Sequence, residues 1–165
     1  MNAAPNLELS TQSAYLALGS NIQPERFIPL AVDELTKRFT VVEVSSVWES
    51  PAEGFVGADF LNAIVHIQTK MTPVSLKYRI LRPLEAQLGR VRTDHKYSPR
   101  TSDIDILIFG DEVLDKEIWY QPHLAVPLAE LLPDLKHPNL GESMHQIARN
   151  FKNFTKISRK EGILR

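Results

Sequence analysis

The stretch SPRTSDIDILIFGDE, residues 98–112, joins a charged segment to an apolar run and a turn. The run from Asp103 to Phe109 is rich in isoleucine, which is typical of a buried strand, and Gly110 predicts a turn directly after it. Successive side chains of a strand lie on opposite faces, so Asp103 and Asp105 are predicted to share one face of the sheet. The opposite face is predicted to carry Ile104, Ile106 and Ile108.

The acid–x–acid step at Asp103 and Asp105 indicates a metal site. Two like charges side by side repel each other unless a cation lies between them. The simplest ion to bind there is a hard cation, which prefers oxygen ligands. A solvated strand face, or a carboxylate that caps a turn, is the alternative for the same two residues.

A helix is predicted before this block, over residues 73–88. Thr72 is a typical N-cap, a proline follows it at the first helical position, and Gly89 marks the end. One face of the helix carries Leu76, Ile80, Leu84 and Leu88. Pro83 falls inside the pattern and predicts a kink, because proline has no N–H to donate.

The first half of the chain predicts, in order, a strand, a helix and two further strands. Residues 13–21, SAYLALGSN, predict a strand that ends in a turn, and residues 24–38 predict a helix that begins at a proline. Residues 40–50, TVVEVSSVWES, and residues 60–70, FLNAIVHIQTK, are β-branched runs that predict two more strands. A loop with one proline and two glycines, PAEGFVGAD, joins them.

The resulting order, β-α-β-β-α-β, predicts an α+β fold of the ferredoxin-like kind, which is an antiparallel sheet with helices packed on one face. A strand over residues 113–119 is expected to pair back onto the sheet. Two short helices, near residues 127–132 and 143–151, are expected to close the domain.

The chain of 165 residues suits one domain, over residues 13–151, with polar or basic extensions at 1–12 and 152–165. The last stretch is expected to be loosely ordered. No cysteine occurs, which excludes a disulfide framework, a thiolate metal site and a cysteine nucleophile. The start has no secretory pattern and no apolar run reaches membrane-spanning length, so we expect a cytoplasmic protein without membrane contact.

Charge is ordered along the chain, although the net charge is only −1. Residues 77–100 hold seven Lys and Arg against two acids, and residues 103–117 hold six acids against one lysine. Arginines bind phosphate oxygens and carboxylates bind hard cations, so this order predicts a ligand that combines a polyphosphate with a metal ion. A solvated helix face followed by a charged hairpin is the alternative.

Four segments together carry a family likeness: YLALGSN, FLNAIV, LEAQLGRVR and PRTSDIDILIFGDEVL. In order and spacing they resemble the 6-hydroxymethyl-7,8-dihydropterin pyrophosphokinases over roughly residues 13–135. The resemblance implies transfer of the intact pyrophosphoryl group from ATP to the pterin hydroxymethyl oxygen, giving AMP, in folate biosynthesis. It also implies small-molecule substrates and two Mg²⁺ ions, and we expect a monomer that binds no nucleic acid.

The resemblance also assigns roles to individual residues. The Mg²⁺ ions would be held by Asp103 and Asp105. The catalytic arginines that would face the phosphates are Arg90, Arg92 and Arg100. The implied nucleotide contacts are Glu85, Ile106 and His123. The implied pterin-side contacts are Ser50, Pro51, Phe60, Asn62 and Tyr97.

One departure from the family pattern lies directly after the Pro–His step. Members typically continue with a longer loop that contains an arginine and a phenylalanine, whereas here LAV joins His123 to Pro127. The phosphate and metal half of the pattern is therefore more complete than the pterin half. The alternative function is that of a divergent paralogue, which binds ATP and Mg²⁺ but uses another acceptor or is inactive.

Two other classes of protein are disfavoured by the sequence. A ferredoxin-like RNA-binding module would need an aromatic and basic strand pattern and a basic net charge. A polymerase-β-like nucleotidyltransferase would place its Gly–Ser step close to its acid pair, whereas Ser20 and Asp103 lie far apart in this chain.

Overall fold

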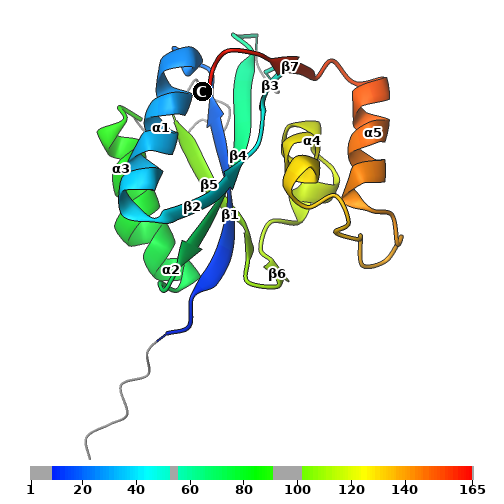
Figure 1. Ribbon diagram of the computed structural model, residues 1–165. Helices are drawn as coiled ribbons and strands as arrows, with labels where there is room; N and C mark the ends of the chain where they lie inside the picture. The colour runs from blue at the N-terminus through cyan, green and yellow to red at the C-terminus, as the bar shows by residue number, and fades with distance from the viewer. Residues whose placement is uncertain (1–8, 53–55, 91–101, 165) are drawn as a thin grey trace, which may run out of the picture.

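The computed structural model describes residues 9–52, 56–90 and 102–164, which form one antiparallel sheet with helices on both faces (Figure 1). The strand order is β6-β5-β1-β4-β3-β7, and β2 also pairs with β4. The strands are β1 Gln12–Ser20, β2 Thr40–Val44, β3 Val47–Ser50, β4 Phe60–Thr69, β5 Asp103–Phe109, β6 Glu112–Val113 and β7 Ser158–Lys160. The position of β1 between β5 and β4 confirms the predicted ferredoxin-like α+β fold.

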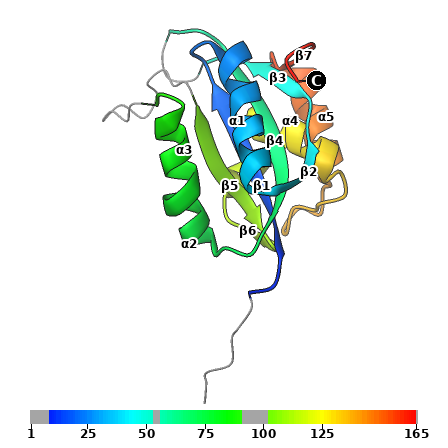
Figure 2. The ribbon, with the colours of Figure 1, turned by 60° about the vertical axis from the view of Figure 1, so that its left-hand side comes forward.

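Helices form a layer on each face of the sheet (Figure 1, Figure 2). They are α1 Pro24–Arg38, α2 Pro73–Ser75, the π-helical η1 Leu76–Leu81, α3 Arg82–Gln87, the 3-10 segment η2 Lys116–Trp119, α4 Pro122–Leu131 and α5 Met144–Phe154. The predicted layer is α1 with α2 to α3, and we call the face that it covers the first face. On the second face lie α4 and α5, where the prediction placed no helices. None of the helices in the described ranges has the length and apolar character needed to cross a membrane.

Each layer encloses its own apolar core. The core of the first face includes Leu16, Leu35, Leu84 and Ile104. The core of the second face includes Ala17, Ile64, Leu107 and Leu128. Side chains alternate along β1 and β4 and pack in both cores, which explains why the middles of these two central strands are buried and mostly apolar.

The helix predicted over residues 73–88 is continuous across Pro83, but its middle is wider than an α-helix. Leu76–Leu81 forms a π-helical segment, and the Arg82 N–H donates to the Lys77 carbonyl, five residues earlier. The extra residue of a π turn lies directly before the proline, where the missing N–H would otherwise interrupt the α-helical ladder. The predicted irregularity at Pro83 is therefore a widened turn.

A β-bulge changes the predicted faces of β5. The register with β1 shifts between Tyr15, which faces Ile108, and Leu16, which faces Ile106. Leu107 is the extra residue. The prediction of one shared isoleucine face is therefore correct for Ile104 and Ile106, which pack in or against the core of the first face, and wrong for Ile108, which packs in the second.

The two outer strand predictions also differ from the structure. The single strand predicted over residues 40–50 is divided into β2 and β3, because its register with β4 changes near Ser45. The strand predicted over residues 113–119 is limited to the two residues of β6. After it, Asp115 accepts a hydrogen bond from Glu117 N at 3.0 Å and starts the 3-10 segment η2.

Both late helices are longer than predicted. The helix expected near residues 127–132 begins at Pro122. The helix expected near residues 143–151 runs to Phe154 and begins with a capping box, in which Ser143 and Gln146 each bind the other's backbone N–H.

Residues 157–164 pair with and pack on the sheet, so the prediction of a loosely ordered tail is wrong for these residues. The strand β7 pairs with the outer edge of β3 (Figure 1). Ile157 is buried in a small apolar cluster with residues of α4 and α5, and Ile163 and Leu164 pack against the core of the first face. The tail therefore covers an edge of the sheet that would otherwise be open.

A chain that ends after Thr155 is expected to be less stable than the full chain by about 2 kcal/mol, because it loses the burial of Ile157 and the ladder between β3 and β7. Urea unfolding followed by circular dichroism measures this difference. Arg159→Ser is the matched control, since the Arg159 side chain is exposed and the change leaves the β7 backbone intact. Equal stability of the shortened and full chains would contradict a structural role for the tail.

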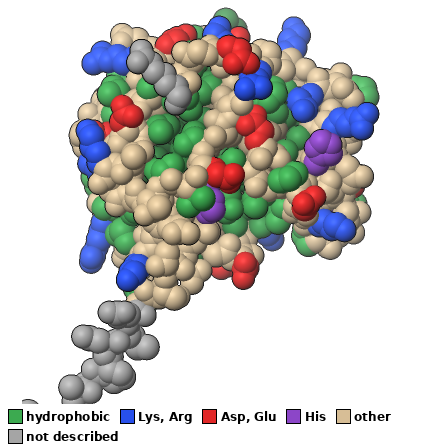
Figure 3. Space-filling view, in the orientation of Figure 1, with side chains coloured by type: hydrophobic (Ala, Val, Ile, Leu, Met, Phe, Trp, Pro, Cys, Tyr) green, Lys and Arg blue, Asp and Glu red, His purple; other side chains and the backbone are tan. Residues whose placement is uncertain are grey.

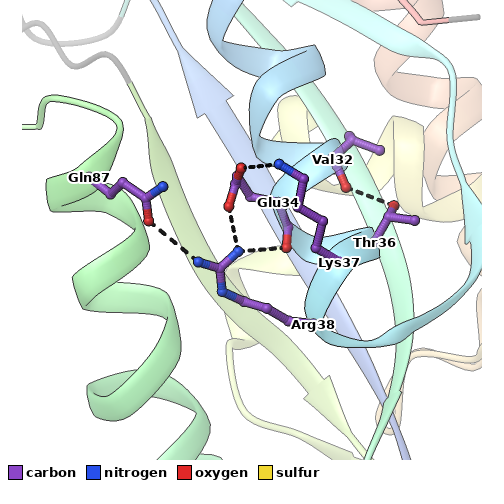
Figure 4. Close-up of polar contacts among 6 residues, drawn as sticks. All are labelled: Val32, Glu34, Thr36, Lys37, Arg38 and Gln87. Carbon is purple, nitrogen blue, oxygen red and sulfur yellow. Dashed lines mark hydrogen bonds and ion pairs between the residues drawn. The ribbon is translucent and has the colours of Figure 1, made fainter.

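Arg38 provides a polar link between α1 and α3, and Glu34 holds Arg38 in place (Figure 4). The Glu34 carboxylate accepts hydrogen bonds from Lys37 Nζ at 2.7 Å and from Arg38 Nη1 at 2.5 Å, and Arg38 also donates to Gln87 Oε1 at 3.4 Å. These donors lower the pKa of Glu34 to about 2. The contacts of Glu34 with Lys37 and Arg38 therefore contribute to stability above the ordinary carboxyl pKa, and this contribution is lost as the pH falls toward 2.

Candidate active site

The C-terminal end of β1 lies between the N-terminal ends of β4 and β5, because both neighbours run antiparallel to it. Gly19 is the residue of β1 at this point, and it pairs with Asn62 on one side and with Asp103 on the other. A Cβ added at Gly19 would lie 3.7 Å from Asn62 Oδ1, 3.9 Å from Phe60 Cδ1 and 4.0 Å from Asp103 Cβ. The sheet therefore brings two predicted pterin-side residues next to a predicted metal ligand.

Asn62 is held in place by its cross-strand neighbours. It is 5% exposed, and its amide nitrogen donates to Ser50 Oγ at 2.8 Å and to the Trp48 carbonyl at 3.2 Å. These bonds use both amide hydrogens, so the carboxamide orientation is fixed, with Oδ1 toward Gly19.

Asp103 and Asp105 lie at the start of β5 on one face, because they pair with Gly19 and Ala17 of β1. Asp103 accepts a hydrogen bond from Arg90. Burial, together with the negative charge of Asp103, raises the pKa of Asp105 to about 6. The two carboxylates therefore form the repelling pair that the sequence predicted.

This carboxylate pair fits Mg²⁺, which prefers hard oxygen ligands and is commonly held by one or two carboxylates together with substrate phosphates. Within the described ranges, no group of three or more His, Cys, Asp or Glu side chains could hold a metal ion. If Mg²⁺ bound here, Asp103 and Asp105 would offer it two carboxylates.

Glu85 of α3 connects the helix to the start of β5. Its carboxylate accepts a hydrogen bond from Ile104 N at 2.8 Å and pairs with Arg82 Nη1 at 3.0 Å and Arg90 Nη1 at 3.3 Å. Glu85 is 1% exposed, and this burial raises its pKa to about 6 against the opposing effects of the Ile104 amide and the two arginines. Because Arg90 also pairs with Asp103, the network fixes the guanidinium of Arg90 beside the aspartates.

The other predicted site residues are placed as follows. Ile106 packs, partly buried, against the core of the first face, across β5 from the two aspartates. His123 lies in the first turn of α4, and Pro51 is exposed directly after β3. Three predicted residues lie outside the described residues: Arg92, Tyr97 and Arg100.

The short segment after His123 is part of a helix. The helix α4 begins at Pro122 and continues through Pro127, so His123 and Pro127 lie in one regular element with no loop between them. The missing loop between His123 and Pro127 therefore changes the local structure, because an inserted loop at this point would interrupt α4.

Two residues beside the site were not predicted. Trp48 pairs directly with Asn62, and its indole Nε1 donates to Glu130 Oε1 at 2.7 Å. No local pattern joins Glu130 of α4 to β3, because the two contacting residues are 82 positions apart. The alternating pattern of β3 would have placed Trp48 opposite Asn62 only if the register change after β2 had been known.

The charges of the face shown in Figure 3 are mixed, with acidic and basic side chains interspersed among hydrophobic ones. The side chains described on this face therefore form no continuous basic surface of the kind that binds a nucleic-acid backbone.

The protein is thus an α+β domain of the ferredoxin-like kind with a candidate site for phosphate and metal. The site lies at one end of the central strands and consists of paired carboxylates, a buried arginine–glutamate network and a fixed asparagine. The sequence model of the family described as 7,8-dihydro-6-hydroxymethylpterin-pyrophosphokinase (HPPK) matches residues 15–133. The chain belongs to this family.

Relatives support this assignment, and a solved structure supports the fold. The chain is 33% identical over 136 residues to the 2-amino-4-hydroxy-6-hydroxymethyldihydropteridine pyrophosphokinase of Aquifex aeolicus, covering 76% of this chain and 84% of the relative. It is 38% identical over 130 residues to the protein of the same name from Bacillus subtilis, covering 72% and 77%. The Plasmodium falciparum HPPK-DHPS A437G structure with pteroate superposes with a TM-score of 0.69 at 13% identity, covering 93% of this chain and 48% of that one. This chain thus spans about half of that two-part protein, and the superposition supports the fold.

Proposed function

We propose that this protein transfers the pyrophosphoryl group of ATP to the hydroxymethyl group of 6-hydroxymethyl-7,8-dihydropterin and releases AMP, as a step of folate biosynthesis. The observation that carries the proposal is the convergence of Asn62, Phe60 and Asp103 on Gly19, which sets a pterin-side wall against a metal-side carboxylate. Membership of the pyrophosphokinase family supplies the reaction type. As part of the same proposal, the enzyme acts as a cytoplasmic monomer.

The proposal assigns two Mg²⁺ ions to Asp103 and Asp105. Bound there, the ions would neutralise negative charge on the phosphate oxygens of ATP. Arg90 is held by Glu85 and Asp103, so its guanidinium stands at the point where those phosphates would meet the carboxylates. Arg92 and Arg100 are proposed to act on the same phosphates.

Charge neutralisation and positioning account for most of the catalysis in this proposal. Transfer of a phosphoryl group between oxygen atoms needs little covalent help from the protein, and preorganised positive charge lowers the barrier without reorganisation. The buried network of Glu85 fixes Arg90 before ATP arrives, so little free energy is lost in ordering that side chain on binding.

The proposed pterin wall consists of Asn62 and the residues around it. A pterin presents hydrogen-bonding groups at its edge and apolar faces, and Asn62 offers an oriented carboxamide while Phe60 offers an aromatic surface. Ser50 supports the asparagine from β3, and Pro51 and Tyr97 are proposed to complete the wall. Glu85, Ile106 and His123 are proposed to act on the nucleotide side, with Glu85 acting through Arg90.

The experiment that tests the proposal is incubation of the protein with ATP, Mg²⁺ and hydroxymethyl-dihydropterin, with AMP scored over time. AMP release that depends on the pterin is the expected result. AMP release without pterin dependence, or none at all, would favour the divergent paralogue, for which the helical segment between His123 and Pro127 is the structural argument.

ATP with Mg²⁺ is expected to raise the melting temperature of the free protein by about 5–10 °C at a ligand concentration near a hundred times Kd, because a ligand that binds only the folded state stabilises it by about 2.7 kcal/mol. Differential scanning fluorimetry measures the shift. Addition of a chelator is expected to remove most of it. A shift that persists in chelator would mean that the arginines bind the nucleotide alone and that the metal assignment is wrong.

A further inference from the structure

The strand segment beside Asn62 contains a change of register. The strand β2 pairs with β4 so that Val44 faces Val65, whereas β3 pairs so that Trp48 faces Asn62. Between these two pairs the β2–β3 side has one residue more than the β4 side, which defines a β-bulge. If the register of β2 continued without the bulge, Val47 would face Asn62.

The register of β3 with β4 determines which groups accept hydrogen bonds from the Asn62 amide. A slip of one residue moves every side chain of a strand to the opposite face. In the observed register, the Asn62 amide donates to the Ser50 hydroxyl at 2.8 Å and to the Trp48 carbonyl at 3.2 Å. With Val47 opposite Asn62, this arrangement would be lost.

Glu130 supplies the contacts that fix the bulge. Its Oε2 accepts a hydrogen bond from Ser46 N at 2.7 Å, and its Oε1 accepts one from Trp48 Nε1 at 2.7 Å. On the other side of the bulge, Ser45 Oγ accepts a hydrogen bond from Ile64 N at 2.8 Å. A bulge leaves a backbone N–H without a partner in the ladder, and at Ser46 the carboxylate of Glu130 takes that place.

The carboxylate of Glu130 is not what attaches α4 to the sheet. The helix is already anchored by apolar side chains, since Ala125 is 0% exposed, Val126 is 2% and Leu128 is 0%. Both oxygens of Glu130 are instead directed at the junction of β2 and β3, on the strand that borders Asn62. The residue therefore acts on the geometry of that strand.

We propose that Glu130 is a positioning residue for pterin recognition: by holding the Ser46 N–H and the Trp48 indole, it keeps β3 in the register that fixes the Asn62 amide. The inference rests on the proposed function, in which Asn62 contacts the pterin edge. The phosphate side of the site is fixed separately, from α3 through Glu85 and Arg90. Loss of the Glu130 contacts is therefore expected to weaken binding of the pterin and to leave binding of ATP nearly unchanged.

Glu130→Gln is the test variant, because glutamine offers one acceptor oxygen where the carboxylate offers two. The expected result is a rise of about tenfold in KM for the pterin, with KM for ATP within about twofold and kcat within about threefold of the wild type. Glu34→Gln is the matched control, since Glu34 also accepts from two donors but lies on α1, in the helix layer of the first face (Figure 4). A merely structural loss would lower the active fraction, and thus the apparent kcat, without changing either KM.

Trp48→Phe tests whether Glu130 acts through the Trp48 indole, since it removes the indole N–H and keeps an aromatic ring. The single variant is expected to raise the pterin KM, and the double variant with Glu130→Gln is expected to show less than the product of the two effects. Equal changes in the KM values of both substrates, or fully multiplicative effects, would overturn the proposal.

A nuclear magnetic resonance readout separates this inference from the proposed function. The side-chain amide resonances of Asn62 are expected to shift in Glu130→Gln and to stay in place in Glu34→Gln, whether or not the protein turns over a pterin. Unshifted Asn62 resonances in Glu130→Gln would overturn the positioning role. Absence of pterin-dependent AMP release in the wild type, with the Asn62 shift present, would overturn the proposed function and leave the structural link between Glu130 and Asn62 supported.

Discussion

Asp105→Asn is expected to lower the rate of AMP release by at least about a hundredfold, because it removes one of the two carboxylates assigned to the metal ions that neutralise the phosphates. Asp103→Asn is expected to have an effect of similar size. Steady-state AMP release at saturating ATP and Mg²⁺ measures both losses, and circular dichroism verifies that the fold is kept. Unchanged turnover in either variant would return the pair to the alternative of a solvated strand face.

The same two variants are expected to differ in stability without ligand. Burial and the charge of Asp103 raise the pKa of Asp105 from the ordinary 3.8 to about 6, so the folded state holds this proton more tightly than the unfolded state. Stability associated with Asp105 is then present below the ordinary pKa and is lost as the pH rises through about 6. Asp105→Asn should therefore be more stable than the wild type at pH 8, by on the order of 1 kcal/mol, and should lose this advantage below about pH 4.

Asp103→Asn provides the contrast in that measurement. Asp103 pairs with Arg90, so its replacement removes an attractive contact together with the repulsion, and no gain in stability is expected. Urea unfolding at pH 4 and pH 8 measures both variants. A pH-independent difference between Asp105→Asn and the wild type would contradict the electrostatic description of the pair.

Glu85→Leu is expected to lower the free energy of unfolding by about 3 kcal/mol, because it leaves two arginines and the Ile104 N–H without the carboxylate that they share. For a chain of this length that loss corresponds to a fall in melting temperature of about 6–12 °C. The variant should also release Arg90 from its fixed position and lower kcat. Thermal unfolding and AMP release measure the two effects.

Glu85→Gln is the matched variant for that prediction. Glutamine keeps an acceptor for Ile104 N and nearly the same shape, while it removes the charge that pairs with Arg82 and Arg90. Its loss of stability should be clearly smaller than that of Glu85→Leu. A leucine variant as stable as the wild type would mean that the buried network contributes no net stability and serves only to position Arg90.

The sequence predicted the elements whose signals are local. The alternation of β1 and β4, the proline at the start of α1 and the glycine after β5 each determine structure through neighbouring residues, and each of these elements is where the pattern predicted it. The errors share a different cause. The bulge at Leu107 and the division of residues 40–50 depend on pairing with a partner strand, which no single segment encodes.

The candidate site divides in the same way. The acidic pair at Asp103 and Asp105 was visible because its spacing matches the period of a strand. The contacts of Glu130 with Ser46 and Trp48 were not, because they join residues 84 and 82 positions apart and follow from the folding of α4 onto the second face. The order of the last residues was also missed, since β7 is stabilised by an edge of β3 that the tail itself does not encode.

Pyrophosphoryl transfer is tested most directly by following the label of ATP that carries its isotope in the β-phosphate. Pyrophosphoryl transfer predicts that the label leaves the nucleotide and appears in a diphosphorylated pterin, in an amount equal to the AMP formed. Retention of the label in ADP would mean that only one phosphoryl group is transferred. Release of the label as free phosphate or pyrophosphate, without a labelled pterin, would contradict the account, because the site would then hydrolyse ATP rather than join it to the pterin acceptor.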